Sequence, residues 1–265
     1  MTRSIEAWID HSCMSDPAGH APRMAGLPAD IGGLGRVVQG LLIHSDWLAA
    51  YGLDEKLLPA GSRQTIAISQ RLTDIIERDG RPLQTARTPD RRAIGTCRDF
   101  ALMLCSMLRS NGVPARVRCG FAAYFHAAWE DHWVCEYWDR SAQTWRLSDA
   151  QIDGVQREKC HIAFDTADVP HQSFVTAGKA WLDCRSGVSD PNRFGHGQTT
   201  GTWLLQINVI RDHYVLNNRE TSVWDGWRDA PASMRIVTER DAVILDELAA
   251  FPERTLVELK PGWLT

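Results

Sequence analysis

The sequence predicts an α+β protein, because one strongly apolar helix is followed at once by several strand-like segments. Residues 98–109 are apolar almost all round, which is typical of a helix buried on most sides. Residues 116–121 alternate polar and apolar side chains, as a half-buried strand does. Residues 132–138 and 144–147 are rich in β-branched and aromatic side chains and predict two further strands.

The predicted helix begins beside Cys97. Its two apolar stripes consist of Phe100, Leu104 and Leu108, and of Met103 and Met107. Asn111-Gly112, followed by Pro114, ends it. The Cys97 thiol would therefore lie on the first turn, at the positive end of the helix dipole, where an imidazolium partner can lower a thiol pKa from ~8.5 to as low as ~3.5. Asp99 lies in the same turn and opposes a thiolate unless its carboxylate turns away.

The strands at 132–138 and 144–147 are expected to form a hairpin around a four-residue loop, 139–142, which is a common length. This loop pairs Trp138 with Gln143, Glu136 with Trp145, and Val134 with Leu147. The same register places His132 directly opposite Asp149, with Cβ atoms about 4.5–5.5 Å apart on one face. A slip of one residue would put the two side chains on opposite faces.

Both flanks are expected to be mainly helical. Apolar side chains recur on one face over 30–50, and a second helix around 68–76 stops at Gly80. Further along, we expect a helix over 203–214 with Thr202 as its N-cap, a helix over 243–249 opened by Thr238-x-x-Asp241, and a long loop over 185–201. The expected domains are an N-terminal helical part of the core (1–80), a central catalytic core (81–155), and a mainly helical C-terminal extension packed on the core (156–265).

The composition is ordinary for a soluble globular protein, with 44% hydrophobic and 23% charged residues among 265. A net charge of −4 gives no broad attraction to nucleic acid or to an anionic membrane. The N-terminus lacks an apolar segment, and no stretch reaches 18 apolar residues, so neither secretion nor a membrane span is expected. Seven cysteines without a C-x-x-C pair favour reduced thiols in a cytoplasmic protein.

Cys97, His132 and Asp149 together supply a thiol, an imidazole and a carboxylate in that order. A thiol attacks a carbonyl group as the thiolate, so it needs a base beside it, and the base needs an acceptor that orients its ring. These three residue types are therefore the parts of a thiol-dependent acyl or amide enzyme.

The stretch from Gly95 to Asp149 resembles the transglutaminase-like superfamily of papain-type enzymes. The matching pieces are Gly95-x-Cys97, Leu108-Arg109-x-x-Gly112-Val113-Pro114-Ala115-Arg116, Cys119-Gly120-Phe121, His132-Trp133 and Trp145-x-Leu147-x-Asp149. The resemblance implies a Cys-bearing helix packed on an antiparallel sheet, with helical N- and C-terminal extensions in this chain. It also implies that Cys97 is the nucleophile, His132 the general base and acid, and Asp149 the orienting acceptor.

Two departures from the family's pattern concern the site. The family's Asp commonly has Pro or Thr near it, whereas Asp149 is followed by Ala150-Gln151. Relatives often have a Trp shortly before the Cys that helps to stabilise the oxyanion, but here no Trp occurs between Trp47 and Cys97. The oxyanion donors are therefore unassigned beyond the Cys97 backbone N–H.

Other residues compete for these roles. Cys105, Cys119 and Cys135 lie inside periodic apolar segments and are interpreted as small buried side chains. His126 is an alternative base, and Asp139 and Asp153 are alternative acceptors. His11-x-Cys13 and Cys160-His161 lack the spacing of a closed zinc site, and Gly32-Gly33-x-Gly35 lacks the strand and third spaced glycine of a nucleotide cradle, so no metal and no cofactor are expected.

The sequence therefore predicts a cysteine-dependent enzyme that acts through a thioester on Cys97. Its substrate would be a peptide, protein or small molecule that bears an amide or a thioester, with no nucleic-acid or membrane partner. Water as acceptor gives a hydrolase, which is slightly preferred, and an amine gives an acyl transferase. A non-catalytic binding module of the same fold is the alternative from another class, and a structural zinc protein is a third.

Overall fold

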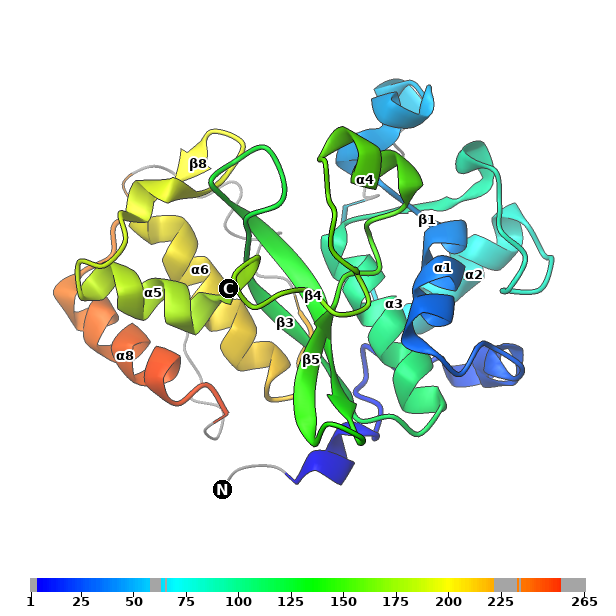
Figure 1. The fold of residues 1–265 in the computed structure, drawn as a ribbon, viewed down its shortest axis with the longest axis horizontal. Coiled ribbons are helices and arrows are strands. Elements are labelled where there is room, and N and C mark those ends of the chain that lie inside the picture. Colours follow the sequence, from blue (N-terminus) through cyan, green and yellow to red (C-terminus); the bar gives the residue numbers. More distant parts are fainter. Residues whose placement is uncertain (1–3, 58–62, 65, 222–232, 234, 254–265) are drawn as a thin grey trace. The chain divides into compact units, whose positions relative to one another are not determined.

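A computed structural model of the chain describes residues 4–57, 63–64, 66–221, 233 and 235–253 (Figure 1). The chain divides into two compact units, each built from separate stretches of sequence. Unit 1 comprises Met1–Arg3, Arg118–His132 and His171–Thr265, and unit 2 comprises Ser4–Val117 and Trp133–Pro170. Helices and strands occur in both, which confirms the α+β class.

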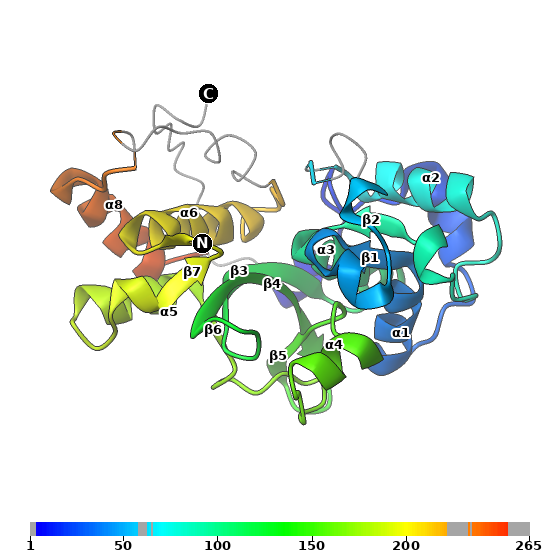
Figure 2. The ribbon, with the colours of Figure 1, turned by 90° about the horizontal axis from the view of Figure 1, so that it is seen from above.

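Three α-helices form the centre of unit 2: α1 (Ile31–Leu41), α2 (Ile68–Arg78) and α3 (Cys97–Ser110). Helix α3 packs against α1 and α2, with the parallel strands β1 (Leu42–His44) and β2 (Ala93–Gly95) beside it (Figure 2). The unit also contains strand β5 (Thr144–Ser148), helix α4 (Gly154–Lys159) and the 3₁₀ helices η1 (Ile5–Trp8), η2 (Ala18–Met24), η3 (Ser45–Tyr51), η4 (Glu55–Leu57) and η5 (Pro89–Arg91).

Helix α3 has the character that its sequence predicts. Every residue from Arg98 to Arg109 is buried, so the helix lies inside the unit. It ends at Ser110, and Gly112 follows with a φ of +72°, a left-handed conformation that favours glycine. The helix predicted around 68–76 is confirmed as α2.

The single helix predicted over 30–50 is wrong beyond Leu41. The chain leaves α1 there and forms β1, whose three residues are all buried. Leu42 pairs with Ala93 and Ile43 with Ile94, followed by the 3₁₀ helix η3. Pairing with a strand about fifty residues later in the chain thus overrides the local helical pattern.

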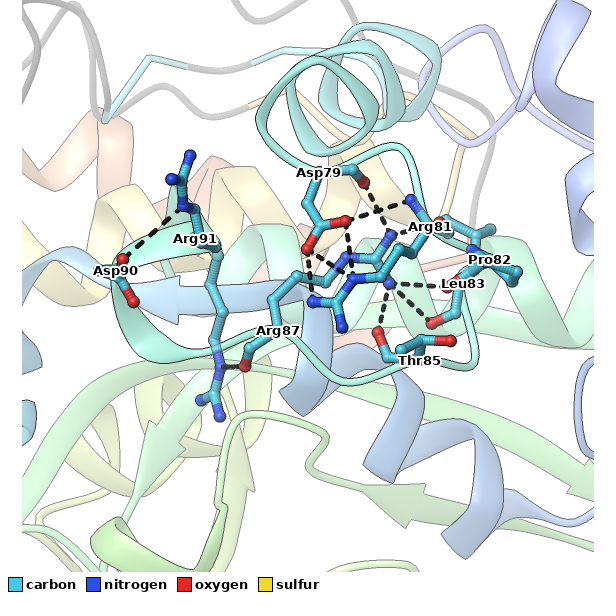
Figure 3. Close-up of polar contacts among 9 residues, drawn as sticks. Asp79, Arg81, Pro82, Leu83, Thr85, Arg87, Asp90 and Arg91 are labelled. Atoms are coloured by element: carbon cyan, nitrogen blue, oxygen red, sulfur yellow. Dashed lines mark hydrogen bonds and ion pairs between the residues drawn. The ribbon is translucent and has the colours of Figure 1, made fainter.

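The loop that leads into β2 is organised around the buried side chain of Arg87 (Figure 3). Its guanidinium donates hydrogen bonds to five backbone carbonyl oxygens, at 2.5–3.4 Å: those of Asp79, Arg81, Pro82, Leu83 and Thr85. The Arg87 backbone N–H donates to the Gly40 carbonyl on α1 at 2.9 Å. The loop is thereby fastened to α1 just before the segment that carries Cys97.

The sheet has the strand order β6-β3-β4-β7-β8, with β5 paired to β4. Its strands are β3 (Ala115–Ala122), β4 (Trp129–Asp139), β6 (Phe174–Thr176), β7 (Phe194–His196) and β8 (Thr199–Thr200), besides β5. The pairs β3–β6 and β4–β5 are antiparallel, as expected, but β7 runs parallel to β4, so the sheet is mixed.

The β4–β5 hairpin exists, but its predicted register is wrong by two residues. Trp138 pairs with Trp145, Glu136 with Leu147 and Cys135 with Ser148, so the four-residue loop is 140–143. The Asp139 carboxylate accepts hydrogen bonds from the backbone N–H groups of Ser141 and Ala142, and Gln143 turns the chain with a φ of +51°. Asp139 is therefore part of the strand and caps the loop, instead of opening it.

Unit 1 is built around three helices that pack side by side: α5 (Ala177–Arg185), α6 (Thr202–Val215) and α8 (Glu239–Ala250) (Figure 1). Helix α8 opens with the predicted capping box between Thr238 and Asp241. Helix α6 begins at Thr202, with Gly201 as its N-cap in place of the predicted Thr202. Across the described residues, no helix is both long and apolar enough to cross a membrane.

The loop predicted over 185–201 contains more structure than expected. It holds the 3₁₀ helix η6 (Pro191–Arg193) and the short strands β7 and β8. Phe194 pairs with Trp129 of β4, and their rings stack with centroids 6.0 Å apart. The contacts of Phe194 with Trp129 therefore join the 185–201 segment to β4, although its composition is that of a loop.

Candidate active site

Cys97 is the first residue of α3. Strand β2 delivers the chain to Thr96, which has an extended conformation, and the helix starts at the next residue. The thiol is free and half-buried. The first N–H groups of an α-helix have no partner within the helix and carry its positive dipole end, so this position favours an anion.

The carboxylate of Asp99 is engaged with cationic and N–H groups. It accepts a hydrogen bond from the Thr96 backbone N–H at 2.8 Å and lies 3.2 Å from Arg71 Nη2 and 3.6 Å from Arg98 Nη1. All three charged side chains are at most 4% exposed. Two guanidinium groups thus face the Asp99 carboxylate, and Arg71 Nη1 also lies 3.5 Å from Asp74 Oδ2.

Gly95 permits this arrangement. A Cβ atom at that position would lie 2.9 Å from the Asp99 Cβ and 3.0 Å from its Oδ2. Because real Cβ atoms do not approach so closely, a larger residue would displace the Asp99 side chain. The Gly95-x-Cys97 spacing therefore has a steric reason in the packing of the first turn.

The cysteines interpreted as structural are buried. Cys105, Cys119 and Cys135 are all fully buried. Burial raises the pKa of the Cys135 thiol well above its usual range, with a smaller contribution from the neighbouring Cys105. Burial also raises the pKa of Cys184 to about 11. The raised pKa makes the thiols of Cys135 and Cys184 poor nucleophiles at neutral pH.

His132 belongs to strand β4 in unit 1, and its side chain is 2% exposed. The rings of Tyr124 and Phe125 lie edge-on to its ring, with centroids 5.8 and 4.9 Å away. Both aromatic residues belong to the connection between β3 and β4, so this connection restricts the imidazole. The competing His126 lies on the same connection and is exposed.

Asp149 follows β5 directly in unit 2 and is 2% exposed. Its backbone N–H donates to the Thr166 carbonyl at 2.8 Å, and its carboxylate accepts a hydrogen bond from the Gln151 N–H at 2.9 Å. The residue also lines a pocket of about 200 Å³ together with residues of α1 and α4, among them Gly32 and Arg36.

The two competing carboxylates have structural partners. Asp153 caps α4 by accepting hydrogen bonds from the Val155 and Gln156 N–H groups, and it lies 3.4 Å from Arg92 Nη1. Asp139 caps the hairpin loop, and its hydrogen bonds with Ser141 and Ala142 lower its pKa to about 2. Both carboxylates thus have local roles in the fold.

Sequence reasoning did not place His44 near the segment that carries Cys97. β1 pairs with β2 so that His44 lies opposite Gly95, two residues before Cys97. The expected helix over 30–50 hides this relationship, because only the long-range strand pairing brings the two segments together. Among the residues that the structure describes, no group of three or more His, Cys, Asp or Glu is arranged to hold a metal ion.

Comparison with known proteins bears on the same region. Residues 63–150 match the family model of the transglutaminase-like superfamily, whereas no curated protein matches the chain. A solved structure from Cytophaga hutchinsonii, whose title describes a candidate cysteine protease, is 14% identical with a TM-score of 0.35, over 65% of this chain and 45% of that one. This chain therefore covers less than half of that protein's length. The matched residues include Cys97, His132 and Asp149.

Proposed function

We propose that this protein is a cysteine-dependent enzyme that forms a thioester between Cys97 and the acyl group of an amide or thioester substrate. The observation that carries the proposal is the placing of a half-buried thiol at the start of the buried helix α3. The Asp99 carboxylate, which would oppose a thiolate, is matched there by two guanidinium groups. The family match of residues 63–150 supports the same broad class.

His132 is proposed as the general base and acid, and Asp149 as the acceptor that orients its ring. These two assignments rest on the family match of residues 63–150, which includes both residues. In the observed register, Glu136 pairs with Leu147 and Cys135 with Ser148, so the predicted pairing of His132 with Asp149 is not that of the hairpin.

The proposed reaction has two halves. His132 takes the Cys97 proton, the thiolate attacks the carbonyl carbon, and the imidazolium returns the proton to the leaving amine or thiol as the carbonyl–N or carbonyl–S bond breaks. Water or an amine then attacks the thioester, His132 accepts its proton, and Cys97 leaves as the thiolate. A hydrolase is slightly preferred to an acyl transferase, which differs only in the acceptor.

Intact mass spectrometry with p-nitrophenyl acetate as the acyl donor tests this proposal. We expect an acetyl adduct on Cys97 that decays in buffer, and its loss in Cys97→Ala. Cys160→Ala is the matched control, since Cys160 is also a half-buried cysteine, and it should keep the adduct. Acetylation spread over several cysteines, or unchanged in Cys97→Ala, would support the alternative of a non-catalytic binding module.

A further inference from the structure

We infer that His44 is a further catalytic residue, which donates a hydrogen bond from Nε2–H to the oxyanion formed when Cys97 attacks a carbonyl group. The inference rests on the proposed function and deepens it, because it assigns a side chain to the oxyanion site. All of the residues that carry it belong to unit 2.

Strand pairing sets the position of His44. β1 and β2 are parallel, and the register pairs Leu42 with Ala93, Ile43 with Ile94 and His44 with Gly95. Neighbouring strands lie about 4.8 Å apart. Since Gly95 precedes Cys97 by two residues, the backbone of His44 lies close to the segment that carries Cys97. Both strands end at this pair, and the chain after Gly95 enters α3 at once. His44 is thus beside the positive end of the helix.

Stacking on the helix orients the ring. The imidazole stacks on the ring of Phe100, with centroids 6.4 Å apart and an interplanar angle of 24°. Phe100 follows Cys97 by three residues, so the two side chains lie about 60° apart around the helix axis. The His44 side chain is 8% exposed, which restricts its motion. The ring therefore lies against the first turn of α3, which carries both Phe100 and Cys97.

The hydrogen bond at the other ring nitrogen sets the tautomer. His44 Nδ1 accepts a hydrogen bond from the Asp46 backbone N–H at 3.1 Å. A nitrogen that accepts carries no proton, so the neutral ring has its proton on Nε2 and can donate only from there. Protonation of Nδ1 would break this bond. The arrangement suits a neutral hydrogen-bond donor, whereas a triad base needs a carboxylate at its second nitrogen.

The Asp46 carboxylate, on the same segment as His44, interacts with Arg63 and Ser45. Asp46 Oδ1 lies 2.5 Å from Arg63 Nη2 and accepts a hydrogen bond from the Ser45 hydroxyl at 3.1 Å. Arg63 Nε also donates to that hydroxyl at 3.0 Å. These contacts fix the turn that presents the Asp46 N–H to the imidazole.

The chemical step needs no extra reactant. When the thiolate forms a bond to the carbonyl carbon, the π-electron pair moves onto the oxygen. His44 Nε2–H and the Cys97 backbone N–H, which is free of the helix ladder at the first position, donate hydrogen bonds to that oxygen without transferring a proton. The electron pair returns when the leaving group departs. This fills the role for which the sequence offers no tryptophan shortly before Cys97.

Two reactions of the Cys97 thiol distinguish oxyanion stabilisation by His44 from support of the thiolate or of the fold. Alkylation by iodoacetamide displaces iodide and builds no oxyanion, whereas acetylation by p-nitrophenyl acetate does. His44→Phe keeps a ring on Phe100 but removes the donor, and His44→Gln keeps a donor near the Nε2 position. We expect His44→Phe to slow acetylation of Cys97 on the order of 10²-fold. Its alkylation should change by less than about threefold, and His44→Gln should recover about a tenth or more of the wild-type acetylation rate, as retained hydrogen-bond donation requires.

Each other outcome overturns the inference. Equal losses of alkylation and acetylation in both variants would mean that His44 supports the thiolate or the fold, and unchanged acetylation in His44→Phe would mean that it has no role. If His44→Phe does not fold, His44→Gln decides by its ratio of acetylation to alkylation, which must be at least about a tenth of the wild-type ratio. If Cys97 is not acetylated even in the wild-type protein, the proposed function is wrong, and the inference about His44 is wrong with it.

Discussion

The guanidinium of Arg71 lies 3.2 Å from the carboxylate of Asp99, and both side chains are at most 4% exposed. Arg71 comes from α2 and also donates a hydrogen bond to the Ile94 carbonyl in β2 at 2.7 Å. One buried side chain thereby connects the helix before the site, the strand that enters it and the first turn of α3. The ion pair links the stability of the core with the charge beside Cys97.

Replacing Arg71 should therefore lower both the stability of the core and the reactivity of Cys97. Arg71→Met leaves a buried carboxylate with only Arg98 near it, and we expect a loss of about 2–3 kcal/mol in the free energy of unfolding, measured in urea. The alkylation of Cys97 at pH 6 should also slow. Arg78→Met is the control, because Arg78 is on the same helix in a half-buried pair with Asp74, and it should cost less than about 1 kcal/mol. Equal effects of the two substitutions would contradict this assignment.

The carboxylates of Asp149 and Asp153, which both follow β5, should have different roles, the first in catalysis and the second in stability. Asp149→Ala should lower kcat on the order of 10–10³-fold, because the base loses its orienting acceptor. Asp153→Ala should leave kcat nearly unchanged but lower the stability by about 1 kcal/mol, because it removes the N-cap of α4. Steady-state kinetics and urea unfolding of both variants give the comparison. Mild and similar effects on kcat would assign the acceptor elsewhere.

The C-terminal residues should be needed for folding. Arg118 of β3 is buried and forms two hydrogen bonds with the Asp212 carboxylate of α6, at 3.0 and 2.8 Å. Asp212→Ala leaves a buried guanidinium without this carboxylate and should cost about 3–5 kcal/mol. Asp183→Ala, which removes the partner of the exposed Lys179, should cost less than about 1 kcal/mol. A 1–155 fragment that unfolds cooperatively and keeps full activity would refute the expected role of 156–265.

The hairpin should contribute a stability that depends on pH. Hydrogen bonds with Ser141 and Ala142 lower the pKa of Asp139 to about 2 from an ordinary 3.8. A lowered folded-state pKa stabilises the protein above the unfolded pKa, and this stabilisation disappears as the pH falls through the folded value. The Tm difference between the wild type and Asp139→Asn should therefore be constant from pH 7 to about 5 and shrink below about 4. A difference that does not depend on pH would rule out this charge effect.

The elements that could be predicted are those whose signal is local. Helix α3 is apolar on every side and ends at a glycine, so each residue carries part of the evidence. Strand β1 could not be predicted, because three residues carry too little pattern and its partner β2 lies about fifty residues away. The hairpin loop was misplaced because Asp139, a typical turn residue, is paired with Thr144 and caps the loop with its side chain.

The same distinction applies to the site. The position of Cys97 at a helix start was predictable from the apolar run that follows it, and the buried positions of Cys105, Cys119 and Cys135 followed from the apolar periodicity. His44 was not, since its place opposite Gly95 depends on a parallel strand pair within a segment that reads as helix. Arg71 was likewise hidden, because one arginine on an amphipathic helix is ordinarily exposed.

The measurement that tests the central claim most directly is the pH profile of Cys97 alkylation by iodoacetamide, read by peptide mass spectrometry in the wild type and in His132→Ala. If His132 and Cys97 form a thiolate–imidazolium pair, the wild-type thiol should react well below pH 7, faster than the six other cysteines. In His132→Ala the inflection should move towards ~8.5, the value of an unassisted thiol. Superimposable profiles for the two proteins, or a wild-type Cys97 no faster than the half-buried Cys160, would contradict the account.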